Sequence, residues 1–228
     1  MKGSVLGRGF AVIACMACLA CVAAPTASAI PATTVQCGQV ITQDTKLAND
    51  LVGCPKSGLT IGSDTITLDL NGHTISGDGN PDDSEEAGVV NPGFDGVMVK
   101  NGTVTEFTQM INAGVAPVTG MTIRNISGEG IFGDVFVVGD GNVIEKSTLL
   151  GNNQSGIFIH GDNNVITKNL IVGNNDIAIL VSGDANSITK NTIRSGNSCA
   201  AFIDTAGENN VVQKNDTSAT GGICNEPQ

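Results

Sequence analysis

The octet Gly161-Asp162-Asn163-Asn164-Val165-Ile166-Thr167-Lys168 decides the fold, because the chain repeats it at a nearly fixed interval. Related octets lie 22 residues before it and 22 residues after it, and a fourth follows 24 residues later. These copies are Gly139–Lys146, Gly183–Lys190 and Gly207–Lys214. A period in this range indicates stacked structural units, each too small to bury a core of its own.

One repeat, Gly161 to Ser182, predicts three short strands. β-branched and other apolar residues fill 165–167, 170–172 and 177–181, and the intervening residues are mainly Gly and Asn. Gly and Asn tolerate the left-handed backbone that sharp turns need. Three strands and three turns in about 22 residues describe one coil of a single-stranded parallel β-helix, an all-β fold.

The strand alternation predicts which side chains stack inside the coils. Each strand would pair with its copy one layer away, at about 4.8 Å. The expected inner stacks are Ile157 with Ile179, Ile159 with Val181, Ile144 with Ile166, and Leu149 with Ile171. The chain has room for about eight or nine coils with capped ends.

The repeat resembles a known group, the secreted bacterial right-handed parallel β-helix proteins, which are related in fold to pectate lyases and to NosD-type copper-site maturation proteins. The resemblance rests on Asn164-x-Ile166-x-x-Asn169-x-Ile171-x-x-Asn174 followed by Ile177-x-Ile179. It also rests on the segment from Cys37-Gly38 to Leu68-Asp69-Leu70-Asn71-Gly72-His73-Thr74-Ile75, which is similar to an opening coil. The similarity covers most of residues 35–222, and right-handedness is implied by the resemblance alone.

The first 29 residues are typical of an export signal. Lys2 and Arg8 precede an apolar run over 10–24, and Ala27-Ser28-Ala29 fits a cleavage site. Alternatives are a membrane anchor, for which the run is short, and lipid attachment at Cys21. No second apolar segment approaches membrane length. We therefore predict a secreted or extracellular protein, with the periplasm as the alternative.

The charge balance makes nucleic acid a poor partner. The chain has a net charge of −11, and removal of Lys2 and Arg8 with the signal would make it −13. Such a domain repels a phosphate backbone.

Four cysteines would remain after cleavage, and an even number in an exported chain indicates disulfides. Of the three pairings we favour Cys37–Cys54 and Cys199–Cys224, one near each end. The domain prediction is a cap over 30–58, a β-helix over 59–222 with an acidic insertion at 78–93, and a tail over 223–228.

Basic and polar residues recur once per layer. The pairs are Lys100-Asn101, Arg124-Asn125, Lys146-Ser147, Lys168-Asn169, Lys190-Asn191 and Lys214-Asn215. We interpret the Asn column as structural, because stacked amides satisfy turn backbone. An acidic polysaccharide could bind along the basic residues of this column, which are Arg124, Lys146, Lys168, Lys190 and Lys214. The alternative is a solvated stripe, partly neutralised by Asp140, Asp162, Asp184 and Glu208.

The acidic column is also a candidate Ca²⁺ site through Asp140, Asp162 and Asp184. Ca²⁺ needs several oxygen ligands around one point, and carboxylates spaced one per layer supply few. We expect no other cofactor.

A row of apolar residues is predicted to face outward beside the inner Ile and Val. It contains Phe136, Phe158 and Leu180, with Phe202 next, shifted sideways by the longer last repeat. An exposed apolar row indicates a covering loop or a partner, so we expect a monomer or a weak homo-oligomer through this row. The alternative is a platform on which sugars stack, with Phe136 and Phe158 as ligand-binding residues.

No catalytic set stands out among the motifs that enzymes of this fold carry. Asp82-Asp83 lies in the insertion, His160-Gly161-Asp162 is not a Gly-His motif, and Arg124 and Arg194 lack a defined acid cluster. His73 is expected to stabilise a turn. We predict a non-catalytic extracellular module that binds polysaccharide or a surface. The alternatives are a polysaccharide lyase or epimerase acting on uronates and, from the resemblance, a NosD-like metal-site assembly factor.

Overall fold

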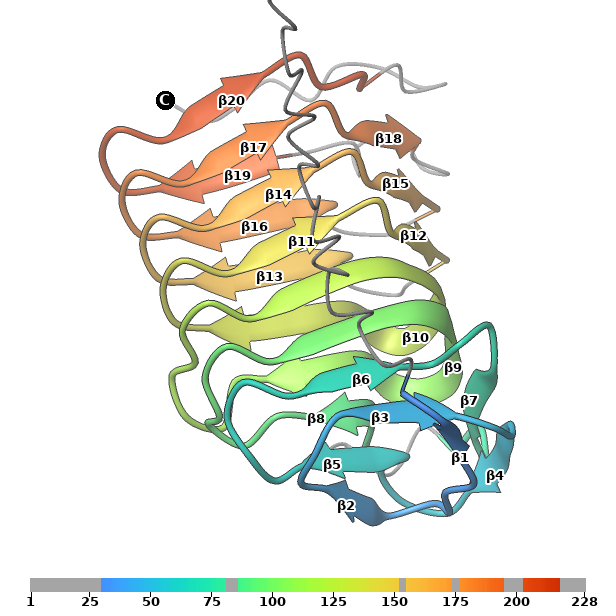
Figure 1. Ribbon diagram of the computed structural model, residues 1–228. Coiled ribbons are helices and arrows are strands. Elements are labelled where there is room, and N and C mark those ends of the chain that lie inside the picture. The colour runs from blue at the N-terminus through green and yellow to red at the C-terminus, as the bar shows by residue number, and fades with distance from the viewer. Residues whose placement is uncertain (1–29, 81–85, 152–154, 174–176, 195–202, 218–228) are drawn as a thin grey trace, which may run out of the picture.

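The computed structural model describes residues 30–80, 86–151, 155–173, 177–194 and 203–217. Within these ranges the chain is all β, with twenty strands in one parallel sheet and no helix. The sheet winds into a stack of coils, so that each strand pairs with its counterpart in the next coil (Figure 1). The predicted parallel β-helix is confirmed.

The strands form three faces that run the length of the stack. The first face contains β1 (Ala32–Thr33), β3 (Thr45–Leu47), β6 (Thr67–Asp69), β11 (Val143–Glu145), β14 (Val165–Thr167), β17 (Ser187–Thr189) and β20 (Val211–Gln213). The second contains β4 (Leu51–Cys54), β7 (Thr74–Gly77), β12 (Thr148–Leu150), β15 (Leu170–Val172) and β18 (Thr192–Arg194). The third contains β2 (Gln39–Ile41), β5 (Leu59–Ile61), β8 (Ala87–Val90), β13 (Ile157–His160), β16 (Ile179–Ser182) and β19 (Ile203–Ala206).

Two long strands pass through all three faces in the middle of the stack. β9 (Met98–Ala113) and β10 (Thr122–Val138) pair with each other along most of their length and join the two halves. Figure 1 shows them as continuous curved ribbons between the short strands above and below.

The described residues make about seven turns, fewer than the eight or nine predicted. One reason is that the coil from β6 to β9 is longer than the others. Leu68 pairs with Val99, 31 residues later, whereas Ile144 pairs with Ile166, 22 residues later. Part of the predicted acidic insertion contributes to the stack, because Ala87–Val90 form β8, while residues 81–85 lie outside the described ranges.

The predicted inner stacks are confirmed. The register places Ile166 on Ile144, Ile171 on Leu149, Ile179 on Ile157 and Val181 on Ile159, and all eight side chains are buried. Complete burial of such a side chain stabilises by about 1.5–3 kcal/mol. Each coil therefore depends on its neighbours for its share of the core.

Two ladders of polar side chains lie at the corners of the coils, and their members are buried except for the half-buried Asn210 and Asn215 at the end of the stack. The first consists of Asn142, Asn164, Asn186 and Asn210, and the second of Ser147, Asn169, Asn191 and Asn215. In both, the backbone N–H of one member donates to the side-chain oxygen of the next, at 2.8–3.0 Å. The amide of Asn169 also donates to the carbonyl of Ile144 at 3.0 Å. These side chains satisfy turn backbone that water cannot reach.

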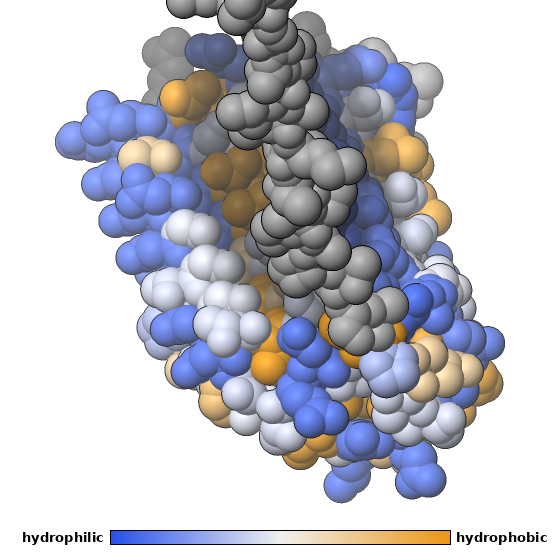
Figure 2. All heavy atoms as spheres, in the orientation of Figure 1, coloured by the Kyte–Doolittle hydropathy of each residue, from blue (hydrophilic) through white to orange (hydrophobic). Residues whose placement is uncertain are grey.

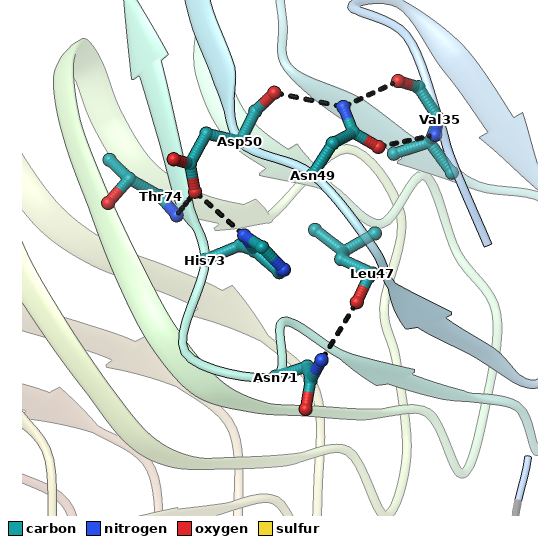
Figure 3. A network of polar contacts seen from close by, with 7 residues as sticks. All are labelled: Val35, Leu47, Asn49, Asp50, Asn71, His73 and Thr74. Atoms are coloured by element: carbon teal, nitrogen blue, oxygen red, sulfur yellow. Dashed lines mark hydrogen bonds and ion pairs between the residues drawn. The ribbon is translucent and has the colours of Figure 1, made fainter. Parts of the chain in front are cut away.

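The opening coils are held by a disulfide and a polar network. The predicted Cys37–Cys54 disulfide is present and connects the loop before β2 to the end of β4. Figure 3 shows the network, in which the Asp50 carboxylate accepts from the Thr74 backbone N–H and contacts His73 Nδ1, both at 2.9 Å. His73 thus supports a turn, as expected from the sequence.

Several expectations lie outside the described residues: the signal segment 1–29, Cys199, Cys224 and the tail over 223–228. Among the residues that are described, no helix is long and apolar enough to span a membrane.

We predict that Asn169→Ala lowers the free energy of unfolding by about 1–3 kcal/mol, because it leaves the buried N–H of Ser147 and the carbonyl of Ile144 without this partner. The matched control is Leu170→Thr, since Thr148 and Thr192 occupy the same position in the neighbouring layers. Urea unfolding followed by circular dichroism measures both. Equal losses in the two variants would contradict a structural role for the ladder.

We also predict that Asp50→Asn makes the free energy of unfolding less dependent on pH in the acid range. The pKa of Asp50 lies below its ordinary 3.8, first because the Thr74 backbone N–H and then because His73 hydrogen-bond to the carboxylate. A folded pKa below the unfolded one gives stability that is fully present above pH 3.8 and is lost as pH falls through the folded pKa.

Urea midpoints between about pH 5 and about pH 2.5 test this expectation. Wild type should lose more stability below pH 3.8 than Asp50→Asn. Glu208→Gln is the control, because the Glu208 carboxylate accepts no hydrogen bond from the described residues. If the stability of wild type and of Asp50→Asn fell in parallel with pH, the hydrogen bonds to the Asp50 carboxylate would not contribute to stability.

Candidate functional site

A column of lysines follows the corner between the first and second faces. Lys146, Lys168, Lys190 and Lys214 each occupy the turn after a first-face strand, with φ between 52° and 60°, and each is exposed. In Figure 1 these turns lie where β11, β14 and β17 lead into β12, β15 and β18. The strand register places the four side chains in line, about 4.8 Å apart at the backbone.

The column is shorter than the sequence analysis expected. Arg124 pairs with Glu145 and Lys100 pairs with Arg124, so neither basic residue lies in line with Lys146. The residues in line with Lys146 are Asn125 and Asn101, which share its left-handed backbone. The physical reason is an interval of 21 residues between these two layers, where the sequence suggested 22.

Three of the four lysines have no acidic partner within the part of the chain that the structure describes. The Lys146 ammonium lies 3.5 Å from the Glu145 carboxylate, with 46% of its side chain exposed. Among the described residues no carboxylate lies within ion-pair distance of Lys168, Lys190 or Lys214. The acidic residues that were expected to neutralise the lysines partly, Asp140, Asp162, Asp184 and Glu208, therefore form no ion pair with this column.

The acidic column lies at a different corner, in the loops that lead from the third face to the first. The Asp140 carboxylate accepts the backbone N–H of Asp162, Asp162 accepts that of Asp184, and Asp184 accepts that of Glu208, each at 2.7 Å. Figure 2 shows hydrophilic residues along this edge at the upper left of the stack. The carboxylates are thus a third ladder that ties successive layers together.

No metal centre is formed by the described part of the chain, where no group of three or more His, Cys, Asp and Glu side chains comes together. His73 precedes β7 and His160 ends β13, so the two histidines belong to different coils and different faces. Asp82 and Asp83 lie outside the described ranges.

The two arginines of the β-helix lie on different faces. Arg124 lies on the first face in β10, and Arg194 lies on the second face in β18. Arg194 forms an ion pair with Asp216 at 2.8 Å, and this hydrogen bond raises the pKa of Arg194. Sequence reasoning had left both arginines without a defined acidic partner.

The outward apolar row lies on the third face. Phe158 pairs with Phe136 on one side and with Leu180 on the other, as the repeat predicted. The two rings lie 5.1 Å apart, with their planes tilted by 44°. In the next layer Leu180 pairs with Asp204 of β19, and Phe202, which was expected to be shifted sideways, lies outside the described residues.

An open pocket of about 240 Å³ lies at one end of this aromatic pair. Three segments line the pocket: β9, β10 and the residues before and within β13. The lining residues are Gln109 from β9, Gly133, Asp134, Val135 and Phe136 from β10, and Ser155 and Phe158 from the third segment. It follows a double irregularity in the pairing of β9 with β10, where the register shifts on each side of Gly130. Such bulges redirect side chains and are common beside binding sites.

The sequence analysis missed the polar residues of this pocket, Gln109, Asp134 and Ser155. The 22-residue pattern gives no signal for them, because the register shift around Gly130 is not repeated in later layers. The pattern found only Phe136 and Phe158, which lie in regularly paired positions.

Comparison with known proteins identifies one family. The model of the family described as periplasmic copper-binding protein (NosD) matches residues 57–225. No curated protein and no solved structure matches the chain.

Proposed function

This chain belongs to the family of periplasmic copper-binding proteins (NosD), and from that premise we propose that it is a non-catalytic β-helix module that holds acidic polysaccharide along its lysine column. Family membership supports a periplasmic or extracellular location. Such a location would bring the protein into contact with polymers of the cell envelope.

The observation that carries the proposal is the identity of the residues at the left-handed turn. A positive φ costs a residue with a Cβ about 1–2 kcal/mol, and Asn tolerates it best. Asn101 and Asn125 occupy this position in two layers, so the turn does not require lysine. Four successive lysines here therefore call for a reason other than backbone geometry.

An anionic polymer provides that reason. Like charges one layer apart repel each other unless a counter-charge lies between them. A chain of carboxylates running along the stack would compensate Lys168, Lys190 and Lys214, which have no acidic partner among the described residues. The column offers charge and hydrogen-bond donors without a paired acid and base, which suits binding.

We predict that the triple variant Lys168→Asn, Lys190→Asn, Lys214→Asn is not retained on immobilised polygalacturonate or alginate. Asn keeps the left-handed turn, so the variant should unfold at the wild-type urea concentration. Retention of wild type should fall with added salt, because exposed charge pairs are screened over about 10 Å at 0.1 M salt.

The matched control is Lys46→Gln, Lys56→Gln, Lys100→Gln, which removes the same charge from other parts of the surface. It should be retained like wild type. Passage of wild type through both columns, or equal loss in the two triple variants, would refute the lysine column as the binding site.

A second candidate function, copper binding, is favoured by the description of the family. The described residues do not fit a copper site, because they contain no cluster of His, Cys, Asp and Glu donors and the two histidines lie in different coils. We therefore derive no role for copper from this geometry.

Titration of the mature protein with Cu⁺ and Cu²⁺ tests this candidate directly. Stoichiometric binding that survives His73→Ala and His160→Ala would assign copper to donors other than these two histidines. Binding that either substitution removes would assign it to that histidine and contradict the assessment above.

A further inference from the structure

The pocket beside Phe136 and Phe158 has an apolar wall that packing holds in place. The Phe136 ring lies over Gly114 in the preceding layer, where a Cβ would collide with the ring. Phe158 packs on Phe136 from the following layer, at 5.1 Å between ring centroids. Both side chains are half-buried, so the wall is supported from beneath and remains open to solvent.

The same glycine helps to orient a hydrogen-bond donor that lines the pocket. The Gly114 backbone N–H donates to Asn112 Oδ1 at 2.9 Å, and the Asn112 amide donates to Gln109 Oε1 at 2.7 Å. The carboxamide oxygen of Gln109 therefore accepts one hydrogen bond, which orients the group, and its NH₂ group has no partner among the described residues. Gln109 thus presents an oriented donor to the pocket.

A buried carboxylate and an accessible hydroxyl complete the surroundings of the pocket. Asp134 has a relative exposure of 0%, so it supports the pocket wall from within, and its carboxylate accepts the backbone N–H of Gly130 at 3.0 Å. The half-buried Ser155 supplies a hydroxyl that can both donate and accept. A buried carboxylate in an acidic protein disfavours an anionic ligand.

The size of the pocket limits its ligand. At about 240 Å³ it is smaller than the 300–1,000 Å³ typical of sites for drug-sized molecules. It suits one small ring with an apolar face and several hydroxyls. We propose that this pocket binds a single uncharged pyranose ring, stacked on Phe136 and Phe158 and hydrogen-bonded to Gln109 and Ser155.

This site is independent of the lysine column. The pocket opens on the third face, whereas the lysines follow the corner between the first and second faces. The ligands also differ, because one site takes an uncharged ring and the other takes an anionic polymer. Either site can therefore fail without the other.

The experiment is a titration of the mature protein with methyl α- and β-glycosides of glucose, galactose and mannose, followed by nuclear magnetic resonance. Saturation transfer to ring protons should report binding of at least one glycoside. Chemical-shift changes should appear at the side-chain NH₂ of Gln109 and at the Phe158 ring. Shift changes confined to other residues would overturn the assignment.

Two substitutions test the contacts. Phe158→Leu removes a ring from the wall, and Leu180 shows that leucine fits the same position one layer on. Gln109→Glu keeps the acceptor for Asn112 and removes the oriented donor. Each should weaken the affinity about tenfold or more, the size expected for losing one buried contact of this kind.

The variant Lys168→Asn, Lys190→Asn, Lys214→Asn is the control and should bind the glycosides like wild type. Absence of glycoside binding to wild type, or wild-type affinity in both pocket variants, would overturn the proposal. So would analytical ultracentrifugation that shows a dimer of wild type and a monomer of Phe158→Leu, since the row would then be an interface between copies of the chain.

Discussion

The fold depends on one repeated hydrogen bond, in which a buried side-chain oxygen accepts the backbone N–H of the neighbouring layer. Asn164 and Asn169 each accept such a bond from the layer before and donate their own backbone N–H to the layer after. A coil displaced by one residue would lose these bonds and would turn its inner isoleucines outward. The ladders therefore fix the register, and the register determines which residues line up on the outside.

The outer columns follow from that register and not from residue type. Asp140, Asp162 and Asp184 have the composition of a cation site, yet their carboxylates are used to connect layers. The lysines have no such use. Each lysine occupies a left-handed turn that Asn101 and Asn125 occupy in other layers. Backbone geometry therefore does not explain why lysine recurs at this position. This difference is why the proposed function rests on the lysines.

The irregular middle of the stack has the opposite character. β9 and β10 are the two strands that cross all three faces, and their pairing shifts around Gly130. The shift opens the space lined by Gln109, Asp134 and Ser155. Gly114 supports both sides of this pocket. It leaves room for the Phe136 ring, and its backbone N–H donates to Asn112, which in turn donates to Gln109. In this protein the pocket lies where the repeat is broken, beside the register shift around Gly130.

The coil, its three strands and the inner stacks such as Ile144 with Ile166 could be predicted from the sequence alone, and the Cys37–Cys54 disulfide was the favoured one of three possible pairings. These features are local or recur at a constant interval, so one repeat predicts the next. Tertiary structure decided that Arg124 pairs with Glu145 and is separated from the lysines, and that Gln109 reaches the pocket of Phe136. Both depend on a shift of one residue between layers. Only the hydrogen-bonded register records such a shift, because a change of one residue in the interval is too small to stand out from the variation between repeats.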